Sequence, residues 1–409
     1  MRRVAMATAL LWLAPVVHAQ GFFDDSKVDL DTRLLSYNRD WRSGSGQSFG
    51  RETASLTQLR FISGFTPGPI GFGFDLAAMA ALRLDSSAGH AGVLLRTDAQ
   101  SNAYQFSGKI LPTFKAKAAN TLLEVGSVIS YLPVLQYDGA VLPQAFRGAR
   151  ITSTDVGNLT LSAGRFIDVM NRSGVSYVPI QIGPGSPSFK TVTGNHAFDY
   201  AGGDYNAAAW RTRASYYFAR FEDVYDQHYL GALNDLSLPQ GSLRSDVRVF
   251  SSRDQGQAAA GRIDNFLYSV LLSYSVGAHK LSASYQKSNG GSAFPYISGT
   301  DPYLVNYQLV GTFSGKSESS WKVQYEYNFK DFGIPELTVS NLYVKGTGIA
   351  TASGTGYEWE RNTDVTYVFD KNGPLKNLRL KWRNGTYRTN YTRNVDENRV
   401  LLIYTLALK

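Results

Sequence analysis

The feature that most constrains the fold is a strict alternation of apolar and polar residues, which recurs in many short segments of the chain. Residues 320–329 read SWKVQYEYNF, and residues 378–383 read LRLKWR. Successive side chains of an extended strand point to opposite faces, so each segment would have one apolar face and one polar or charged face. A helix, with about 3.6 residues per turn, would mix the two classes around its circumference. The alternation therefore predicts an all-β fold.

Short turns join neighbouring alternating segments and predict antiparallel hairpins. The turn KDFGIP leads from 320–329 into ELTVSNLYVKG at 336–346, and GAH joins 268–276 to 280–288. Other connections are long and polar, and these are Trp41–Glu52, Asp85–Asn102, Leu132–Arg150 and Ser173–Asn195. Short turns at one end and long loops at the other are typical of an outer-membrane β-barrel, whose short turns face the periplasm.

Composition favours a membrane barrel over a soluble sheet protein. The mean hydropathy is −0.21, yet 13% of the residues are aromatic, with 25 Tyr, 22 Phe and 6 Trp. Transmembrane strands show alternation in place of a hydropathy peak, so this value does not exclude a membrane. A soluble β-sandwich or propeller would also alternate. However, the apolar faces here end in aromatic residues, as interfacial girdles do, and the last segment, RVLLIYTLALK, keeps one apolar face to the terminus.

The start of the chain has the pattern of a secretory signal peptide. Arg2 and Arg3 precede the apolar run 4–17, and Val17-His18-Ala19 is a small-residue cleavage pattern. We expect cleavage after Ala19, which makes 1–19 the signal peptide and 20–409 a single barrel domain. A membrane-anchoring helix is disfavoured because it would need about 20 apolar residues. With about 10 membrane residues per strand, the remaining chain predicts between about 14 and 18 strands. There is no cysteine, so no disulfide can form.

Several long segments resemble the OprD-type substrate-specific outer-membrane porins, the outer-membrane carboxylate channels, and the resemblance runs through essentially the whole mature chain. It implies a transmembrane antiparallel barrel of 18 strands, monomeric or loosely trimeric, narrowed by third and seventh extracellular loops that fold inward. It also implies that small carboxylate-bearing nutrients pass by diffusion. The segments are LPVLQYDGAVLPQAFRG (132–148), FDYAGGDY (198–205), QHYLG (227–231), FPYISGTDPYLVNY (294–307), FGIPELT (332–338), YEWERNTD (357–364) and LKNLRLKWRNGTYRTNY (375–391).

The resemblance further implies a ladder of basic residues down the inner wall of the barrel. Alternation independently places the charges of LRLKWR on the face opposite its apolar residues. At Arg165 alternation disagrees, because Leu159, Leu161 and Ala163 fall on the same face, so either a bulge intervenes or Arg165 is not part of the ladder. For any single arginine, a solvated or interfacial charge is the alternative. The expected ladder residues are Arg33, Arg39, Arg60, Arg147, Arg165, Arg379, Lys381, Arg383 and Arg399.

Four loop residues are expected at the constriction by the same resemblance. Asp301, Tyr296 and Tyr303 would lie in the seventh loop and Asp138 in the third. There an acid would meet a substrate ammonium or hydroxyl group. The alternative for Asp301 is a turn-forming role before a proline. Acidity at the constriction would separate a porin for aromatic or other monocarboxylates, which we favour, from one for basic amino acids or peptides.

Other function classes have little support in the sequence. The five histidines are isolated, and there is neither an HExxH motif nor a Walker loop, so we expect no enzyme activity, metal or cofactor. The net charge of +8 contains no long basic run, and we expect no nucleic-acid partner. An outer-membrane lipase or an adhesion barrel remains an alternative. The expected partners are small carboxylate-bearing solutes, the outer-membrane lipid of a Gram-negative bacterium and the barrel assembly machinery.

Overall fold

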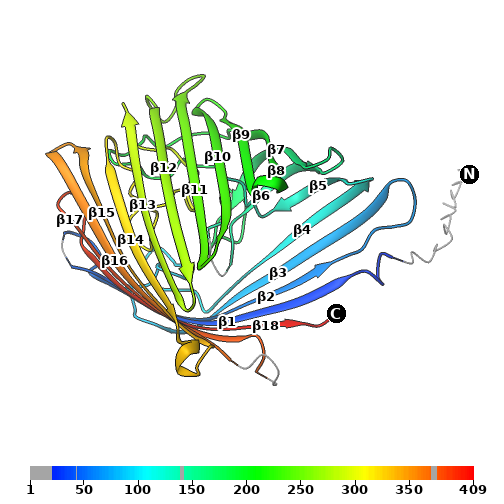
Figure 1. Ribbon diagram of the computed structural model, residues 1–409, viewed down its shortest axis with the longest axis horizontal. Helices are drawn as coiled ribbons and strands as arrows, with labels where there is room; N and C mark the ends of the chain where they lie inside the picture. Colours follow the sequence, from blue (N-terminus) through cyan, green and yellow to red (C-terminus); the bar gives the residue numbers. More distant parts are fainter. Residues whose placement is uncertain (1–20, 43, 139–141, 370–374) are drawn as a thin grey trace, which may run out of the picture.

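The described residues form one closed antiparallel sheet of 18 strands, so the predicted all-β barrel is confirmed (Figure 1). The structure is a computed structural model that describes residues 21–42, 44–138, 142–369 and 375–409. The predicted signal peptide lies outside these residues. No helix among the described residues is long and apolar enough to cross a membrane. The elements are β1 (Lys27–Trp41), β2 (Phe49–Ile62), β3 (Gly71–Ser86), β4 (Phe106–Ala118), β5 (Thr121–Val128), β6 (Ala145–Ser153), β7 (Leu159–Met170), β8 (Phe198–Ala207), η1 (Ala208–Trp210), β9 (Thr212–Phe221), β10 (Tyr225–Leu238), β11 (Gly241–Asp254), β12 (Asp264–Val276), β13 (His279–Gly290), β14 (Ser319–Asn328), η2 (Phe329–Phe332), β15 (Leu337–Thr351), β16 (Gly354–Val368), β17 (Leu378–Thr389) and β18 (Val395–Ala407).

The first strand closes the barrel by pairing with both β2 and β18. Its register with β18 runs from Asp29 opposite Ala407 to Trp41 opposite Val395. Closure leaves no strand edge, which lipid requires because it offers backbone groups no hydrogen-bond partner. The strand number lies at the upper end of the range predicted from chain length and agrees with the resemblance.

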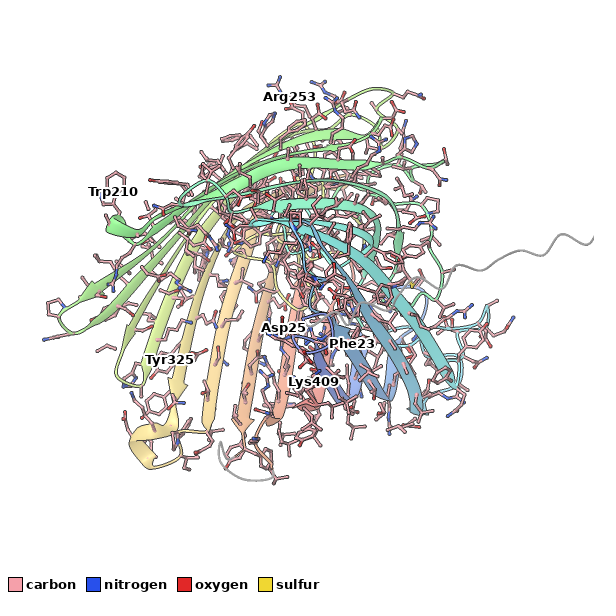
Figure 2. All side chains as sticks on the ribbon, turned by 90° about the vertical axis from the view of Figure 1, so that its right-hand side faces the viewer. Phe23, Asp25, Trp210, Arg253, Tyr325 and Lys409 are labelled. Atoms are coloured by element: carbon pink, nitrogen blue, oxygen red, sulfur yellow. The ribbon has the colours of Figure 1, made fainter. Side chains whose placement is uncertain are left out.

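Each strand separates its side chains as the alternation predicted. On β14, Trp321, Val323 and Tyr325 are 45%, 44% and 44% exposed, whereas Ser320 and Lys322, at alternate positions, are buried. The exposed set faces away from the barrel and the buried set faces its interior. Trp210, at the turn between β8 and β9, also projects away from the barrel (Figure 2). The barrel therefore presents an apolar, aromatic surface outward and a polar surface inward, which suits a surrounding membrane.

The two ends of the barrel differ in their connections, as predicted. One end, here called the turn end, holds short connections such as 119–120 and 277–278. The C-terminus lies at this end, because β18 finishes beside the start of β1 (Figure 1). The opposite end, here called the loop end, holds the long connections. Two connections at the loop end, 222–224 and 352–353, are nevertheless short.

Four long loops at the loop end shape the interior of the barrel. They are loop 2 (87–105), loop 3 (129–144), loop 4 (171–197) and loop 7 (291–318), numbered in chain order among the connections of this end. Ala91 and Leu95 of loop 2 are buried in a cluster with Leu35 and Leu56 of the inner wall. The resemblance implied that loops 3 and 7 fold inward, and the structure adds loop 2.

Loop 4 also folds inward, where it packs with loop 7. Ile182 and Ile297 form an isolated β-bridge between the two loops, and both are buried. The same hydrophobic cluster contains Phe198 of β8 and Phe250 of β11, so both loops are packed on the inner wall. Apolar packing of this kind gives the loops fixed positions inside the barrel rather than above it.

Candidate functional site

A basic cavity lies inside the barrel, between the wall and the inward-folded loops. Its volume is about 670 Å³, and it is lined by strands β1, β2, β17 and β18 together with residues of loops 2, 3, 4 and 7. Its charged lining among the described residues consists of five arginines against two aspartates. These are Arg33, Arg39, Arg172, Arg383, Arg399, Asp138 and Asp301.

Strand register brings the wall arginines together from opposite ends of the chain. Arg383 of β17 lies directly opposite Arg399 of β18, and Arg399 lies opposite Tyr37 of β1. Arg39, two residues further along β1, falls on the same inward face. Cross-strand neighbours on one face of an antiparallel sheet are within side-chain reach. The cavity wall therefore presents a continuous basic surface that no single segment of the sequence contains.

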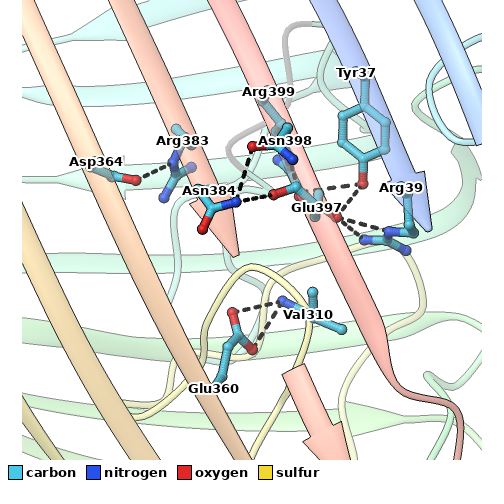
Figure 3. Close-up of polar contacts among 10 residues, drawn as sticks. All are labelled: Tyr37, Arg39, Val310, Glu360, Asp364, Arg383, Asn384, Glu397, Asn398 and Arg399. Atoms are coloured by element: carbon cyan, nitrogen blue, oxygen red, sulfur yellow. Dashed lines mark hydrogen bonds and ion pairs between the residues drawn. The ribbon is translucent and has the colours of Figure 1, made fainter. Parts of the chain in front are cut away.

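A buried carboxylate forms ion pairs with two of these arginines. Glu397 of β18 has no exposed surface and accepts hydrogen bonds from Tyr37 Oη at 2.6 Å and Arg39 Nε at 2.8 Å (Figure 3). It also pairs with Arg399, whose Nε lies 2.5 Å from Oε1. Charge-assisted hydrogen bonds of this kind hold both guanidiniums in one orientation. Because an arginine has five donors, each guanidinium keeps donors for a solute in the cavity.

Three further basic residues of the wall also have carboxylate partners. Lys381 Nζ and Arg383 Nε lie 3.1 and 3.0 Å from the carboxylate of Asp364 on β16. Figure 3 shows the contact between Asp364 and Arg383. Arg33 pairs with Asp31 at 2.6 Å. The ladder therefore consists largely of ion pairs whose acids lie in the wall, and these pairs reduce its net charge while they fix its geometry.

The two aspartates of the cavity come from the loops, as the resemblance implied. Asp138 of loop 3 lies 3.5 Å from Arg172 of loop 4, and Asp301 of loop 7 accepts a hydrogen bond from Tyr307 at 2.8 Å. Burial raises the pKa of the Asp301 carboxyl above its usual value, while the bond from Tyr307 acts in the opposite direction. Asp301 therefore has less tendency to be charged than an exposed aspartate.

Buried charges on the inner wall hold the loops that shape this cavity. Glu52 of β2 accepts hydrogen bonds from the backbone N–H groups of three successive loop 2 residues, at 2.8, 2.6 and 3.1 Å. Glu360 of β16 accepts from the backbone N–H of Val310 of loop 7 (Figure 3) and from that of Gly311. Lys109 of β4 donates to carbonyls of loops 3 and 4 at 2.8 to 3.2 Å. Carboxylates thus bind loop N–H groups and the lysine binds loop carbonyls, which satisfies both buried partners.

Of the predicted site residues, six line the cavity: Arg33, Arg39, Arg383, Arg399, Asp138 and Asp301. Lys381 and Arg379 lie on the same inward face of β17 as Arg383, towards the turn end. Arg60 pairs with Asp29 of the inner wall at 3.3 Å.

The remaining predicted residues lie outside the cavity lining. Arg147 pairs with Asp168, and its guanidinium lies 4.9 Å from the ring of Tyr177. Tyr296 packs against the hydrophobic cluster of the wall. The guanidinium of Arg248 stacks on the ring of Tyr303, with its Cζ atom 3.7 Å from the ring centre. The loop 7 tyrosine that does line the cavity is Tyr307, so the predicted positions of Tyr296 and Tyr303 are corrected.

Arg165 is the clearest correction, because it lies on the outer face of the barrel. Phe166 beside it is fully buried inward, while Leu161 and Ile167, on its own face, are 43% and 46% exposed. Arg165 pairs with Asp199 of β8 at 2.9 Å. The bulge that would have turned it inward is absent from β7 between Leu159 and Phe166, since the described register with β8 is continuous there. The alternation therefore predicted the outward position of Arg165 correctly.

Sequence reasoning missed Arg172 and Tyr307 in the cavity, the wall acids Glu397 and Asp364, and the inward folding of loops 2 and 4. The acids do carry a signal, since they occupy inward positions of strands already predicted. Most of their partners carry no such signal, because Tyr37, Arg39, Lys381 and Arg383 lie on other strands than the acid they contact. Arg399, on the same strand as Glu397, is the exception.

Comparison with known proteins agrees with this architecture. Residues 20–408 match the family described as "outer membrane porin, OprD family". The chain is 32% identical to the porin-like protein GalP of Pseudomonas putida over 395 residues, covering 95% of this chain and 94% of GalP. Among solved structures, OccK9 (OpdG) of Pseudomonas aeruginosa has a TM-score of 0.90 and 36% identity, covering 95% of this chain and 100% of OccK9. OpdK of the same species, solved with vanillate, has a TM-score of 0.88 and 30% identity, with the same coverage. The chain therefore belongs to the OprD family of outer membrane porins.

Proposed function

We propose that this porin passes small aromatic monocarboxylates across the outer membrane by passive diffusion. The observation that carries the proposal is the cavity lining, which combines arginines with the partly exposed side chains of Leu94, Leu309 and Leu401. A carboxylate would accept charge-assisted hydrogen bonds from the guanidiniums, and an aromatic ring would lie against the leucines. The presence of vanillate, an aromatic carboxylate, in the related OpdK structure supports the same substrate class.

The wall acids suit transport rather than tight binding. A channel conducts when a solute binds well enough to enter but weakly enough to leave. Glu397 and Asp364 neutralise part of the charge behind the ladder, so a carboxylate meets oriented donors without an excess of positive charge. Lys381 and Arg379 continue the basic face towards the turn end and would offer the solute further weak sites on its way to the periplasm.

Basic amino acids are the alternative substrate class, because Asp138 and Asp301 would bind an ammonium group. Two observations favour carboxylates. The lining contains more arginines than aspartates, and both aspartates already have partners in Arg172 and Tyr307. A solute cation would have to compete with these partners.

No enzyme or adhesion function is needed to explain the site. Residues 46–50, GQSFG, have the spacing of a nucleophile elbow. That motif works at a strand-to-helix turn, however, and here it leads from the first loop directly into β2. Because one chain closes the barrel, we also propose that the monomer is the conducting unit and that insertion uses the barrel assembly machinery.

The proposal is tested by solute uptake into liposomes that contain the refolded protein. Benzoate, neutral benzamide and arginine would be compared for the wild type, for Lys381→Ala/Arg383→Ala, and for a control, Arg361→Ala. Arg361 lies between the buried, inward-facing Glu360 and Asn362 and so faces outward. We expect benzoate to enter faster than benzamide, and only the double variant to lose this advantage. Equal rates for benzoate and benzamide would refute the proposal, and faster arginine uptake would favour the alternative.

A further inference from the structure

A groove on the outer face of the barrel lies outside the transport pathway. Its volume is about 730 Å³, and it runs over strands β6 to β10. Small residues, namely Ala163, Ala201, Gly203 and Ala214, make room for it, and its surface is almost entirely apolar. Since this face of an outer-membrane barrel contacts lipid, hydrocarbon must fill the groove, because an empty groove would lose the dispersion contacts of its lining.

Larger apolar residues also line the groove and form its borders. Leu161 and Leu230 are 43% and 57% exposed, and Tyr216 is 49% exposed. A depression with raised apolar borders would hold one chain in place longer than a flat surface would. The shape therefore favours a specific chain over the general lipid environment.

A row of charged residues crosses the outer face immediately above the groove, towards the loop end. Arg165 lies two residues beyond Ala163 on β7, Asp199 two residues before Ala201 on β8, and Arg220 near the end of β9. Arg165 lies opposite Asp199, and Asp199 opposite Arg220, in the strand register. Charged residues on the lipid-facing surface cost least at the level of the headgroups, so this row marks that level and places the groove below it.

We propose that the groove binds one acyl chain of a phosphate-bearing lipid of the outer leaflet, with the lipid phosphate against Arg165 and Arg220. The orientation fits this leaflet, since the charges lie towards the loop end and the groove extends from them towards the turn end. A lipid of the opposite leaflet would place its headgroup at the other end of the strands.

The two arginines are held as phosphate-binding arginines need to be. Arg165 Nη1 lies 2.9 Å from Asp199 and its Nη2 lies 3.5 Å from Glu222. Arg220 donates from Nε and Nη2 to Asp226, at 2.8 and 2.7 Å, in a pair that does not use Nη1. The two side chains remain 56% and 49% exposed. The acids orient the guanidiniums, and the exposed donors match phosphate oxygens.

The test is native mass spectrometry of the protein extracted from outer membranes in a mild detergent. The variants are Arg165→Gln/Arg220→Gln, which removes the charges, and Ala201→Phe, which fills the groove. Arg361→Gln on β16 is the matched control, because it removes an outward arginine away from the groove. Heat-dependent migration on gels and unchanged channel conductance would show that each barrel is folded.

We expect the wild type and the control to retain a phosphate-bearing lipid, and each groove variant to retain about tenfold less, since each loses part of the contact with one end of the lipid. Retention that is equal in all four proteins would overturn the proposal. Preferential retention of a lipid without phosphate would overturn the role of the arginines. A lipid-free dimer that Ala201→Phe dissociates would show that a second copy of the chain fills the groove instead.

Discussion

Glu397 provides the sharpest test of how the ladder works, because one buried carboxylate holds two of its arginines. Replacing it with glutamine keeps the shape and one acceptor oxygen but removes the charge. Arg39 and Arg399 lie within 2.5 Å of Glu397 and would lose their counter-charge. We expect the barrel to fold, because both arginines are partly exposed, with side-chain exposures of 23% and 24%, and water can solvate them.

The size of the effect on transport follows from the distance to a bound solute. A carboxylate bound on the cavity side of either guanidinium would lie roughly 7 Å from Glu397, where two like charges repel by about 2 kcal/mol at an effective dielectric constant of about 20. Removing that repulsion would strengthen binding by about thirtyfold. The substitution Glu397→Gln should therefore make the channel more anion-selective and lengthen the time that benzoate spends in it.

Single-channel recording in a planar bilayer measures both quantities, as the reversal potential in a salt gradient and as the duration of benzoate blocks. Tyr37→Phe is the matched control, because it removes a hydrogen bond to Glu397 without changing any charge. Its block durations should change by no more than about fivefold, as expected for one hydrogen bond of about 1 kcal/mol. If Glu397→Gln leaves both the reversal potential and the block duration at wild-type values, the wall acids do not control the charge that a solute meets.

Three further predictions concern the loops and their anchors. Folding raises the pKa of Asp301, so its proton is bound more tightly in the folded protein and its contribution to stability is lost as the pH rises through the folded pKa. Because the protonated form is neutral, anion selectivity should rise as the pH falls from neutrality through this raised pKa, which lies above the usual aspartate value of about 4. Asp301→Asn should be anion-selective throughout, and a pH profile in this variant that matches the wild type would contradict the assignment. Glu360→Gln should weaken the attachment of loop 7 and increase current fluctuations, whereas a recording as quiet as the wild type would mean that packing alone holds the loop. Lys109→Met should release loops 3 and 4, raise conductance and reduce the preference for benzoate over benzamide in uptake assays, and a fully selective variant would exclude this anchoring role.

Much of the fold was predictable because the alternation of a strand is a local property. The faces of LRLKWR and SWKVQYEYNF follow from the geometry of an extended chain alone, and the structure has both as predicted. The same alternation correctly indicated that Arg165 does not belong to the ladder. The inward position of Arg383 could be predicted from the alternation within its own strand.

The sequence by itself thus determined an outer-membrane barrel with short turns at one end and a basic inward face on its penultimate strand. Tertiary structure decided which charges of different strands meet. Tyr37 and Glu397 are 360 residues apart in the chain and touch only because β1 closes on β18. Glu52 contacts loop 2 and Lys109 contacts loop 4, and their partners in the loops are backbone groups, which give no signal in the sequence. Alternation is set by neighbours one and two residues away, whereas the cavity is set by register and closure, which bring together residues that no local pattern connects.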